Sequence, residues 1–322
     1  MKMKQDDQND AYGNTWDSEV SEEGEFVRHQ TSFRSQVRAD GSTDFPPASG
    51  RYHLYVSYAC PWAHRTLITR KLKGLDEAIS FDVVHPLLPQ SGWSFDDSAP
   101  GATGDSICGF RDLRQAYLAS SPEFEGAITV PVFWDKDSGK IVNNESAEII
   151  RMLNTEFQEF ATNPELDLYP KEKRQQIDEV NDWIYETINN GVYRCGFATT
   201  QRAYSRAFKG LFASLDRVED ILADSRYLTG STMTEADVRL FTTLVRFDAV
   251  YVTHFKCNLK RIIDYPNTWG FTRDIHQTPG VAETVDMAHI KSHYYVSHRH
   301  INPYGIVPDG PELDFNEPHG RG

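Results

Sequence analysis

Residues 51–75 read RYHLYVSYACPWAHRTLITRKLKGL, and this stretch decides the fold. Apolar side chains alternate along its beginning, as they do on a half-buried β-strand: Tyr52, Leu54 and Val56. Pro61 suits the first helical position, where its missing N–H costs nothing, and Gly74 suits the end of that helix as a cap. A second apolar run at residues 79–84 follows. The sequence therefore predicts a strand–helix–strand unit.

The rest of the chain extends this unit and then changes character. Further strands are expected at 127–135 (AITVPVFWD) and 140–142, a helix at 144–157, and a loop-rich stretch at about 86–125. After about residue 165 the pattern is amphipathic and helical, without convincing strands. We predict an α/β domain followed by an all-α domain. The expected boundaries are an N-terminal extension at 1–50, the α/β domain at 51–165, the helical domain at 166–295 and a C-terminal tail at 296–322.

Charge and hydropathy exclude several classes of function. The chain carries 33 Lys and Arg against 47 Asp and Glu, a net charge of −14, so phosphate backbones and anionic lipid surfaces repel it on average. No stretch approaches the length of apolar chain that spans a bilayer. The first ten residues, MKMKQDDQND, turn acidic where a signal peptide would need apolar residues. We expect a cytoplasmic protein with neither a nucleic acid nor a membrane as its partner.

Cys60 is the candidate nucleophile. The chain has no C-x-x-C pair and no zinc spacing among its four cysteines, which are Cys60, Cys108, Cys195 and Cys257. Cys60 precedes a helix that begins with proline, so its sulfur is expected to face the positive end of the helix dipole, a setting that lowers the pKa of a thiol. The alternative is a buried, inert cysteine. Position 63 holds Ala63, so a disulfide formed at Cys60 requires an external thiol, of which glutathione is the abundant cytosolic one.

Two further motifs suggest where a peptide-like ligand binds. Val130 precedes Pro131 at the start of a predicted strand, where thioredoxin-like folds place a cis proline whose preceding backbone pairs with a peptide ligand. An edge-strand proline explains the dipeptide equally well. Glu145 and Ser146 begin the next predicted helix, where a carboxylate, a hydroxyl and free N–H groups can receive an amino-acid-like group. Plain helix capping is the alternative for this pair.

Together these elements resemble the glutathione transferases. Thr234 to Asp237, in TGSTMTEADVRL, is similar to the structural capping box of their helical domain. Longer blocks resemble the glutathionyl-hydroquinone reductases, the Xi-class transferases, over roughly residues 12 to 320. These blocks are YVSYACPWAHRTLITRKLKGL, GWSFDDSAPGATGD, VPVFWDK, NNESAEIIRM, NNGVYRCGFATTQ and RFDAVYVTHFKC.

The resemblance implies a function and a set of site residues. It implies glutathione-dependent reduction of glutathionyl-hydroquinones, with glutathione as co-substrate, no metal or nucleotide, and a homodimer formed through the C-terminal domain. The implied catalytic residues are Cys60, Tyr193, Tyr251 and Tyr294. The implied glutathione-binding residues are Trp93, Ala127, Ile128, Thr129, Val130, Glu145 and Ser146. Some members carry a basic residue where this chain has Ala127, so a contact to a glutathione carboxylate is lost or supplied elsewhere.

Other functions compete with this one. A glutaredoxin-like thiol transferase or dehydroascorbate reductase would use the same Cys60 but needs no proton donor for a carbon leaving group. A conjugating transferase favours Ser or Tyr to activate glutathione, and a non-catalytic ligand carrier would hold an unreactive thiol. Three histidines near the C-terminus suggest a metal site, although exposed tail side chains are the simpler interpretation: His293, His298 and His300.

Overall fold

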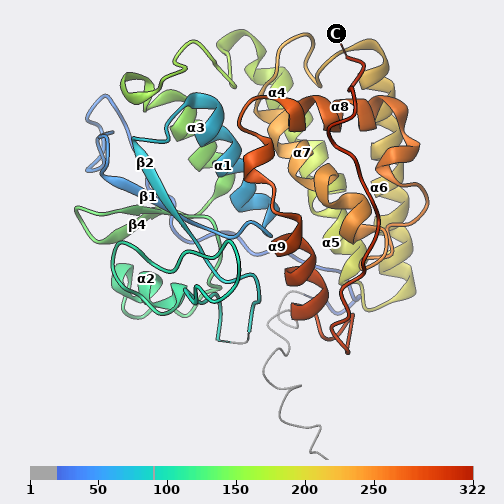
Figure 1. Cartoon of the computed structure of the whole chain (residues 1–322), viewed down its shortest axis with the longest axis horizontal. Coiled ribbons are helices and arrows are strands. Elements are labelled where there is room, and N and C mark those ends of the chain that lie inside the picture. Colours follow the sequence, from blue (N-terminus) through green and yellow to red (C-terminus); the bar gives the residue numbers. More distant parts are fainter. Residues whose placement is uncertain (1–19, 90, 322) are drawn as a thin grey trace, which may run out of the picture. The chain divides into compact units, whose positions relative to one another are not determined.

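Two units make up the described part of the chain, residues 20–89 and 91–321 of the computed structural model (Figure 1). The described residues of unit 1 are 30–89, 91–166 and 283–307, and those of unit 2 are 20–29, 167–282 and 308–321. This division differs from the sequence-based boundaries in the extension, which is shared between the units, and at 283–295, which belongs to unit 1. The first ten residues, which carry the prediction about a signal peptide, lie outside the described part.

Unit 1 is built on a mixed four-stranded sheet. Its strands are β1 (Tyr52–Val56), β2 (Ile79–Val83), β3 (Val132–Asp135) and β4 (Lys140–Asn143). They lie in the order β2-β1-β3-β4; β1 runs parallel to β2 and antiparallel to β3, and β3 runs antiparallel to β4. Leu54 sits in register between Phe81 and Phe133. All five residues of β1 are buried, since both faces of this central strand are covered.

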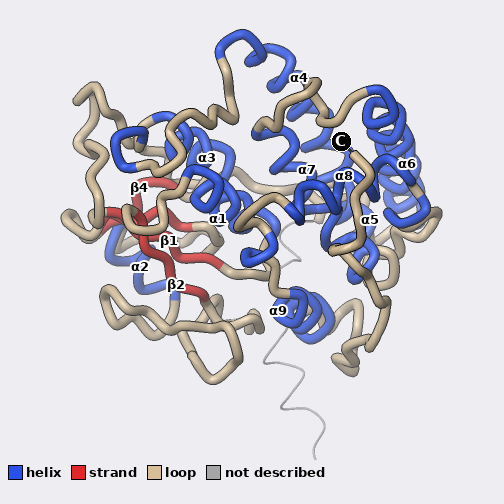
Figure 2. Tube along the Cα trace, turned by 45° about the horizontal axis from the view of Figure 1, so that its top comes forward, coloured by secondary structure: helices blue, strands red, loops and turns tan. Residues whose placement is uncertain are grey.

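Helices cover both faces of the sheet in unit 1 (Figure 2). α1 (Pro61–Lys73) and α3 (Ser146–Thr155) lie on one side and α2 (Leu113–Ser120) on the other. Unit 1 also contains η3 (Gln158–Phe160), α9 (Met287–Ser292) and η9 (His293–Ser297), with η8 (Ala282–Thr284) at its boundary. α1 packs against α3, and α2 packs against β4. α1 begins at Pro61 and ends at Gly74, which has a φ of 63° and caps the last carbonyls through its N–H, as predicted.

Two predictions about unit 1 were wrong in detail. The segment 127–135 was expected to be extended throughout, but β3 begins only at Val132, because Pro131 has no N–H to donate and the residues before it bond elsewhere. The segment 86–125 is loop-rich, as predicted, but the prediction placed no helix in it and it contains α2. Asp112 caps this helix by accepting from the Gln115 N–H, and its apolar side chains are too few for a clear period.

Unit 2 is helical, as predicted, and its described residues contain no named strand. Its helices are η4 (Lys171–Lys173), α4 (Arg174–Ile184), η5 (Tyr185–Asn189), α5 (Gly191–Gly196), α6 (Gln201–Asp224), α7 (Glu235–Arg246), η6 (Phe247–Tyr251), η7 (Ile262–Asp264) and α8 (Pro266–Gln277). The capping box predicted at Thr234 and Asp237 is confirmed at the start of α7. Among the helices of the described part, none combines the length and the apolar character needed to cross a bilayer.

Candidate functional site

Cys60 is the N-cap residue of α1, with extended backbone angles (φ −77°, ψ 119°) and a partly exposed side chain. Its thiol makes no hydrogen bond to the first turn of the helix. Instead it donates to the carbonyl of Val130, with 3.5 Å between sulfur and oxygen. The Val130–Pro131 peptide bond is cis, as predicted. Among the described residues the Val130 N–H has no hydrogen-bond partner, so thiol and backbone lie together where an extended peptide-like ligand can pair.

Tyr117 of α2 holds the loop that carries Val130. Its hydroxyl donates to the Thr129 carbonyl at 2.8 Å and accepts from the Thr129 N–H at 3.1 Å. The side-chain amide of Asn144 donates to the same hydroxyl at 3.0 Å. Burial raises the pKa of Tyr117, so the phenol stays neutral and keeps its proton for Thr129. Within the same loop Ala127 is exposed and Ile128 and Thr129 are half-buried. The loop therefore presents Val130 from a fixed backbone.

Glu145 and Ser146 stand at the start of α3, where the alternatives were ligand binding and capping. The Glu145 carboxylate caps the helix by accepting from the Ala147 N–H at 3.1 Å, and it also accepts from the Thr31 hydroxyl at 3.2 Å. The buried Ser146 hydroxyl accepts from the Arg65 guanidinium at 3.4 Å. Capping is thus present, and Glu145 remains half-buried at a helix N-terminus beside a buried arginine. That set of groups can hold both an ammonium and a carboxylate.

Trp93 lies against a histidine that sequence reasoning assigned to an exposed tail. Its indole stacks on the imidazole of His293, with 5.1 Å between ring centroids, and His293 lies 5.2 Å from the ring of Tyr294. The prediction of exposure was wrong for His293 and His298, which are buried because α9 and η9 fold into unit 1 rather than forming a tail. His300 is exposed. In the part of the chain that the structure describes, no cluster of His, Cys, Asp and Glu forms a metal site.

Tyr193 and Tyr251 come together in unit 2. Tyr193 lies on α5 and is 6% exposed, and its ring centroid is 6.2 Å from that of Tyr251, which is fully buried in η6. Phe197 and Phe255 pack on the same ring at 6.0 and 5.5 Å. Tyr193 and Tyr251 are thus the two rings of this four-ring cluster that carry a hydroxyl group.

Sequence reasoning missed four residues that contact the predicted ones. Arg65 of the CPWAHR block and Tyr117 of the unpredicted helix α2 bond to Ser146 and Thr129. Phe26 and Arg28, from the N-terminal extension, lie over the ring of Tyr193, with the Arg28 guanidinium carbon 4.9 Å from its centroid. Arg65 lies within the CPWAHR block and could have been identified from the sequence. No local pattern marks the other three, because their partners are distant in the sequence.

The remaining cysteines differ from Cys60 in their surroundings. Cys195 and Cys257 are buried, and Cys108 is exposed. Burial raises the pKa of Cys257 well above its usual value, and the neighbouring Cys195 thiol raises it further. Burial also raises the pKa of Cys108. These settings favour the protonated thiol at Cys257 and Cys108, so neither of these two resembles an activated nucleophile.

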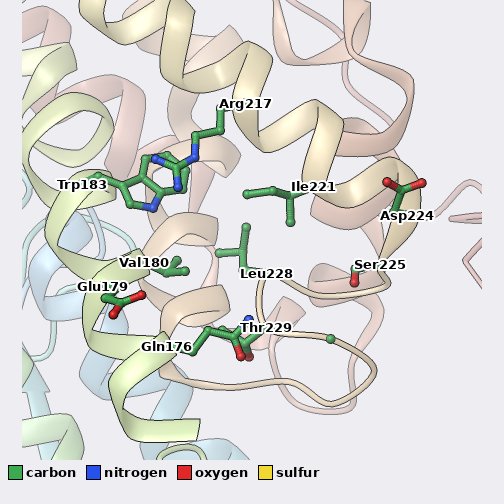
Figure 3. Close-up of a pocket in the computed structure, with 11 residues that line it drawn as sticks. Gln176, Glu179, Val180, Trp183, Arg217, Ile221, Asp224, Ser225, Leu228 and Thr229 are labelled. Atoms are coloured by element: carbon green, nitrogen blue, oxygen red, sulfur yellow. The ribbon is translucent and has the colours of Figure 1, made fainter.

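A groove of about 470 Å³ lies between α4 and α6 in unit 2 (Figure 3). The guanidinium carbon of Arg217 is 4.2 Å from the ring centroid of Trp183 on one side of it. The lining residues are Gln176, Glu179, Val180, Trp183, Arg217, Ile221, Asp224, Ser225, Leu228, Thr229 and Gly230. None of the predicted site residues is in this set.

Both family domains of one superfamily match the chain. The model of the glutathione S-transferase N-terminal domain matches residues 59–156, and that of the C-terminal domain matches residues 201–274. The first match begins just before Cys60 and includes α1, the Val130 loop and the start of α3. The second covers α6, α7 and most of α8. The two matches agree with an α/β unit followed by a helical one.

Several relatives match nearly the whole chain. Glutathionyl-hydroquinone reductase YqjG of Escherichia coli K12 is 55% identical over 97% of this chain and 96% of its own length. PcpF, a glutathionyl-hydroquinone reductase of Sphingobium chlorophenolicum, is 49% identical over 94% of both chains. The glutathione-bound structure of YqjG superposes with a TM-score of 0.87, at 57% identity over 90% of this chain and 96% of that one. The Xi transferase of Phanerochaete chrysosporium gives 0.88, at 52% identity over 91% and 94%.

Proposed function

Because the chain belongs to the Xi-class glutathione transferases, the family of the glutathionyl-hydroquinone reductases, we propose that it reduces glutathionyl-hydroquinones with glutathione as co-substrate. The observation that carries the proposal is the position of Cys60. Cys60 is the N-cap residue of α1, and its partly exposed thiol contacts the carbonyl of Val130, at the point where a glutathione backbone can pair. The glutathione found in the YqjG structure supports this choice of ligand.

The reaction follows in two steps. Tyr193 donates its proton to the ring carbon that bears sulfur, or assists the tautomerisation that places it there. The Cys60 thiolate attacks the glutathionyl sulfur, the carbon–sulfur bond breaks with its electron pair going to the ring, and hydroquinone leaves. A second glutathione thiolate attacks the Cys60–glutathione disulfide, releasing oxidised glutathione and the Cys60 thiolate. The aromatic carbon is reduced by two electrons, and the thioether sulfur of the substrate and the thiol of the second glutathione become one disulfide. The proton of that thiol, passed through solvent, replaces the one that Tyr193 gave to the ring carbon.

Each glutathione-binding residue has a role in this scheme. Val130 offers its N–H and carbonyl to the cysteinyl part of glutathione, on a backbone fixed by Tyr117. Glu145 and Ser146, at the N-terminus of α3, receive the γ-glutamyl ammonium and carboxylate. Trp93 covers the tripeptide, with Thr129, Ile128 and Ala127 bordering it. Tyr251 and Tyr294 assist the stabilisation of the thiolate.

The test follows both products. Purified protein is incubated with a glutathionyl-hydroquinone and excess glutathione, and free hydroquinone and oxidised glutathione are measured by chromatography. We expect equimolar release, abolished in Cys60→Ala and slowed in Tyr193→Phe without loss of glutathione binding. Binding is measured by calorimetry. Release that persists in Cys60→Ala would refute the assignment of the nucleophile.

A thiol transferase is the second candidate. One observation favours it: Cys60, Val130, Glu145 and Ser146, the groups that thiol exchange needs, all belong to unit 1. Good activity on a small mixed disulfide, without hydroquinone release, would support that candidate.

A homodimer formed through the helical domain and a cytoplasmic location stay predictions. Light scattering after size-exclusion chromatography tests the dimer.

A further inference from the structure

Residues 20–29, here called the N-terminal loop, form a tight turn within unit 2. Val20 pairs with Phe26 in an isolated antiparallel bridge, and the Ser21 N–H donates to the Glu25 carbonyl at 2.8 Å. The chain reverses at Gly24, whose φ of 78° lies in the region that favours glycine. The loop therefore has a defined conformation of its own.

Contacts with the start of α6 fix this loop in place. The Gly24 carbonyl accepts from the Thr199 N–H at 3.1 Å, and the carbonyl of the preceding residue accepts from the Thr200 hydroxyl at 2.9 Å. A Cβ atom added at Gly24 would lie 2.6 Å from the Thr199 hydroxyl oxygen and 2.7 Å from the Thr200 methyl group, so nothing larger than glycine fits. Glu25 forms an ion pair with Arg206 of α6. The loop is thus docked by backbone, steric and charge contacts at once.

The docked loop places two side chains over Tyr193. The Phe26 ring stacks on that of Tyr193, with 6.0 Å between centroids and 26° between planes, and is 3% exposed. The guanidinium carbon of Arg28 lies 4.9 Å from the Tyr193 centroid and 5.1 Å from the Phe26 centroid. Its Nε donates to the side-chain carbonyl of Asn190 at 2.8 Å. Arg28 is therefore held over the ring of the proposed acid by a partner on the segment that precedes α5.

A cation in this position acts on the chemistry of a phenol. It is attracted to the face of the neutral ring, and more strongly to the ring after the phenol has lost its proton. The titratable groups whose contacts with Tyr193 the structure gives are Arg28 and Tyr251, and the other neighbouring rings, Phe197 and Phe255, carry no charge. Arg28 thus brings a positive charge to the face of this ring, which favours proton release by Tyr193.

We propose that Arg28 of the N-terminal loop is a positioning residue for Tyr193, required for fast release of the aromatic acceptor but not for thiol exchange. The proposal rests on the proposed function, because it assigns Arg28 to the step in which Tyr193 gives its proton to the sulfur-bearing ring carbon. As that proton leaves, Arg28 stabilises the phenolate that remains. The chemical class of acceptor that needs this device is an electron-rich phenol or quinol bonded to glutathione through carbon.

The test compares neutral and charged replacements at one position. In Arg28→Met we expect kcat for hydroquinone release to fall about tenfold at neutral pH, the size expected for a partly buried cation over an aromatic ring. The alkaline limb of its pH profile moves to higher pH, since Tyr193 becomes a weaker acid. Arg28→Lys keeps the charge and restores both kcat and the profile most of the way. Reduction of the mixed disulfide of glutathione and 2-mercaptoethanol stays within twofold of the unmodified protein in both variants.

Arg206→Met provides the matched control. It removes an arginine that contacts the same loop through an exposed ion pair but has no ring contact with Tyr193 among its described interactions. Hydroquinone release is expected to change less than twofold. Equal losses in Arg28→Met and Arg206→Met, equal losses of release and thiol exchange, or a fall in kcat without a shifted pH profile would each overturn the proposal. Absence of hydroquinone release from the unmodified protein would refute the proposed function itself, before any variant is compared.

Discussion

Tyr117→Phe tests how the glutathione site is held. The hydroxyl that it removes makes two hydrogen bonds to the backbone of Thr129 and one to the side-chain amide of Asn144, at 2.8, 3.1 and 3.0 Å. It also lies 3.2 Å from the Thr129 hydroxyl, and the magnitude is worked from the three shorter bonds. Thr129 precedes Val130, whose carbonyl accepts from the Cys60 thiol. The substitution therefore leaves the fold of the sheet intact and loosens the backbone on which the proposed glutathione contact is built.

The magnitude follows from these three bonds. Each contributes about 1 kcal/mol net, so their loss amounts to about 3 kcal/mol if nothing relaxes. Thr129 is half-buried, and its backbone groups can bind water once the loop moves, whereas the Asn144 side chain is buried. We expect unit 1 to lose about 2 kcal/mol of unfolding free energy. Glutathione must then order the loop as it binds, which raises KM for glutathione about tenfold while kcat stays within twofold.

Tyr52→Phe is the control for this substitution. Tyr52 is equally buried in unit 1, but its hydroxyl makes a single bond, to the Pro46 carbonyl at 2.8 Å, in a segment separate from the Val130 loop. It is expected to cost about 1 kcal/mol of stability and to leave KM unchanged. Stability is measured by urea unfolding, glutathione affinity by calorimetry and KM by the hydroquinone assay. A Tyr117→Phe protein that loses stability but binds glutathione normally would refute the reasoning.

Two further predictions concern stability and thiol reactivity. Burial raises the pKa of Asp237 from 3.8 to about 6, so the folded state binds the proton of this carboxyl more tightly than the unfolded state does. The stabilisation linked to this proton is fully present below the unfolded pKa and is lost as the pH rises through the folded one. The loss of unfolding free energy caused by Asp237→Asn is therefore expected to be about 2 kcal/mol larger at about pH 4.5 than at about pH 7.5; a pH-independent difference in urea unfolding contradicts this. An aromatic disulfide reagent is expected to modify Cys60 and Cys108 in the folded protein and to leave the buried Cys257 untouched until denaturant is added; mass spectrometry of the folded protein checks this, and early labelling of Cys257 would contradict it.

Local signals made much of the fold predictable. Proline and glycine mark the two ends of α1 because each has a backbone preference that only those positions satisfy, and the observed bounds agree. The capping box of α7 is likewise a contact between residues three apart. Helix α2 was not predicted because it is short and has only three buried side chains, too few to show a period of 3.6 residues. Sequence patterns thus predict what neighbours in the chain decide.

Contacts between distant segments could not be predicted in this way. His293 was expected in an exposed tail, yet it stacks on Trp93, two hundred positions earlier in the chain. Arg28 contacts Tyr193 across a similar separation. Neither pair leaves a periodic or compositional trace, because a single long-range contact constrains one residue at each end. The resemblance to a known family supplied the names of Trp93 and Tyr193, but not the partners that hold them.

The division of groups between the two units has a consequence for the chemistry. Thiol exchange needs a nucleophile, a backbone clamp and a γ-glutamyl site, and the residues that we propose for all three belong to unit 1. Cleavage of a carbon–sulfur bond needs a proton donor as well, and the proposed donor, with Arg28 over its ring, belongs to unit 2. Substitutions in the Tyr193 cluster should therefore convert the enzyme toward a thiol transferase, whereas substitutions at Cys60 should remove both activities. The ratio of the two rates, rather than either rate alone, reports which unit a variant has damaged.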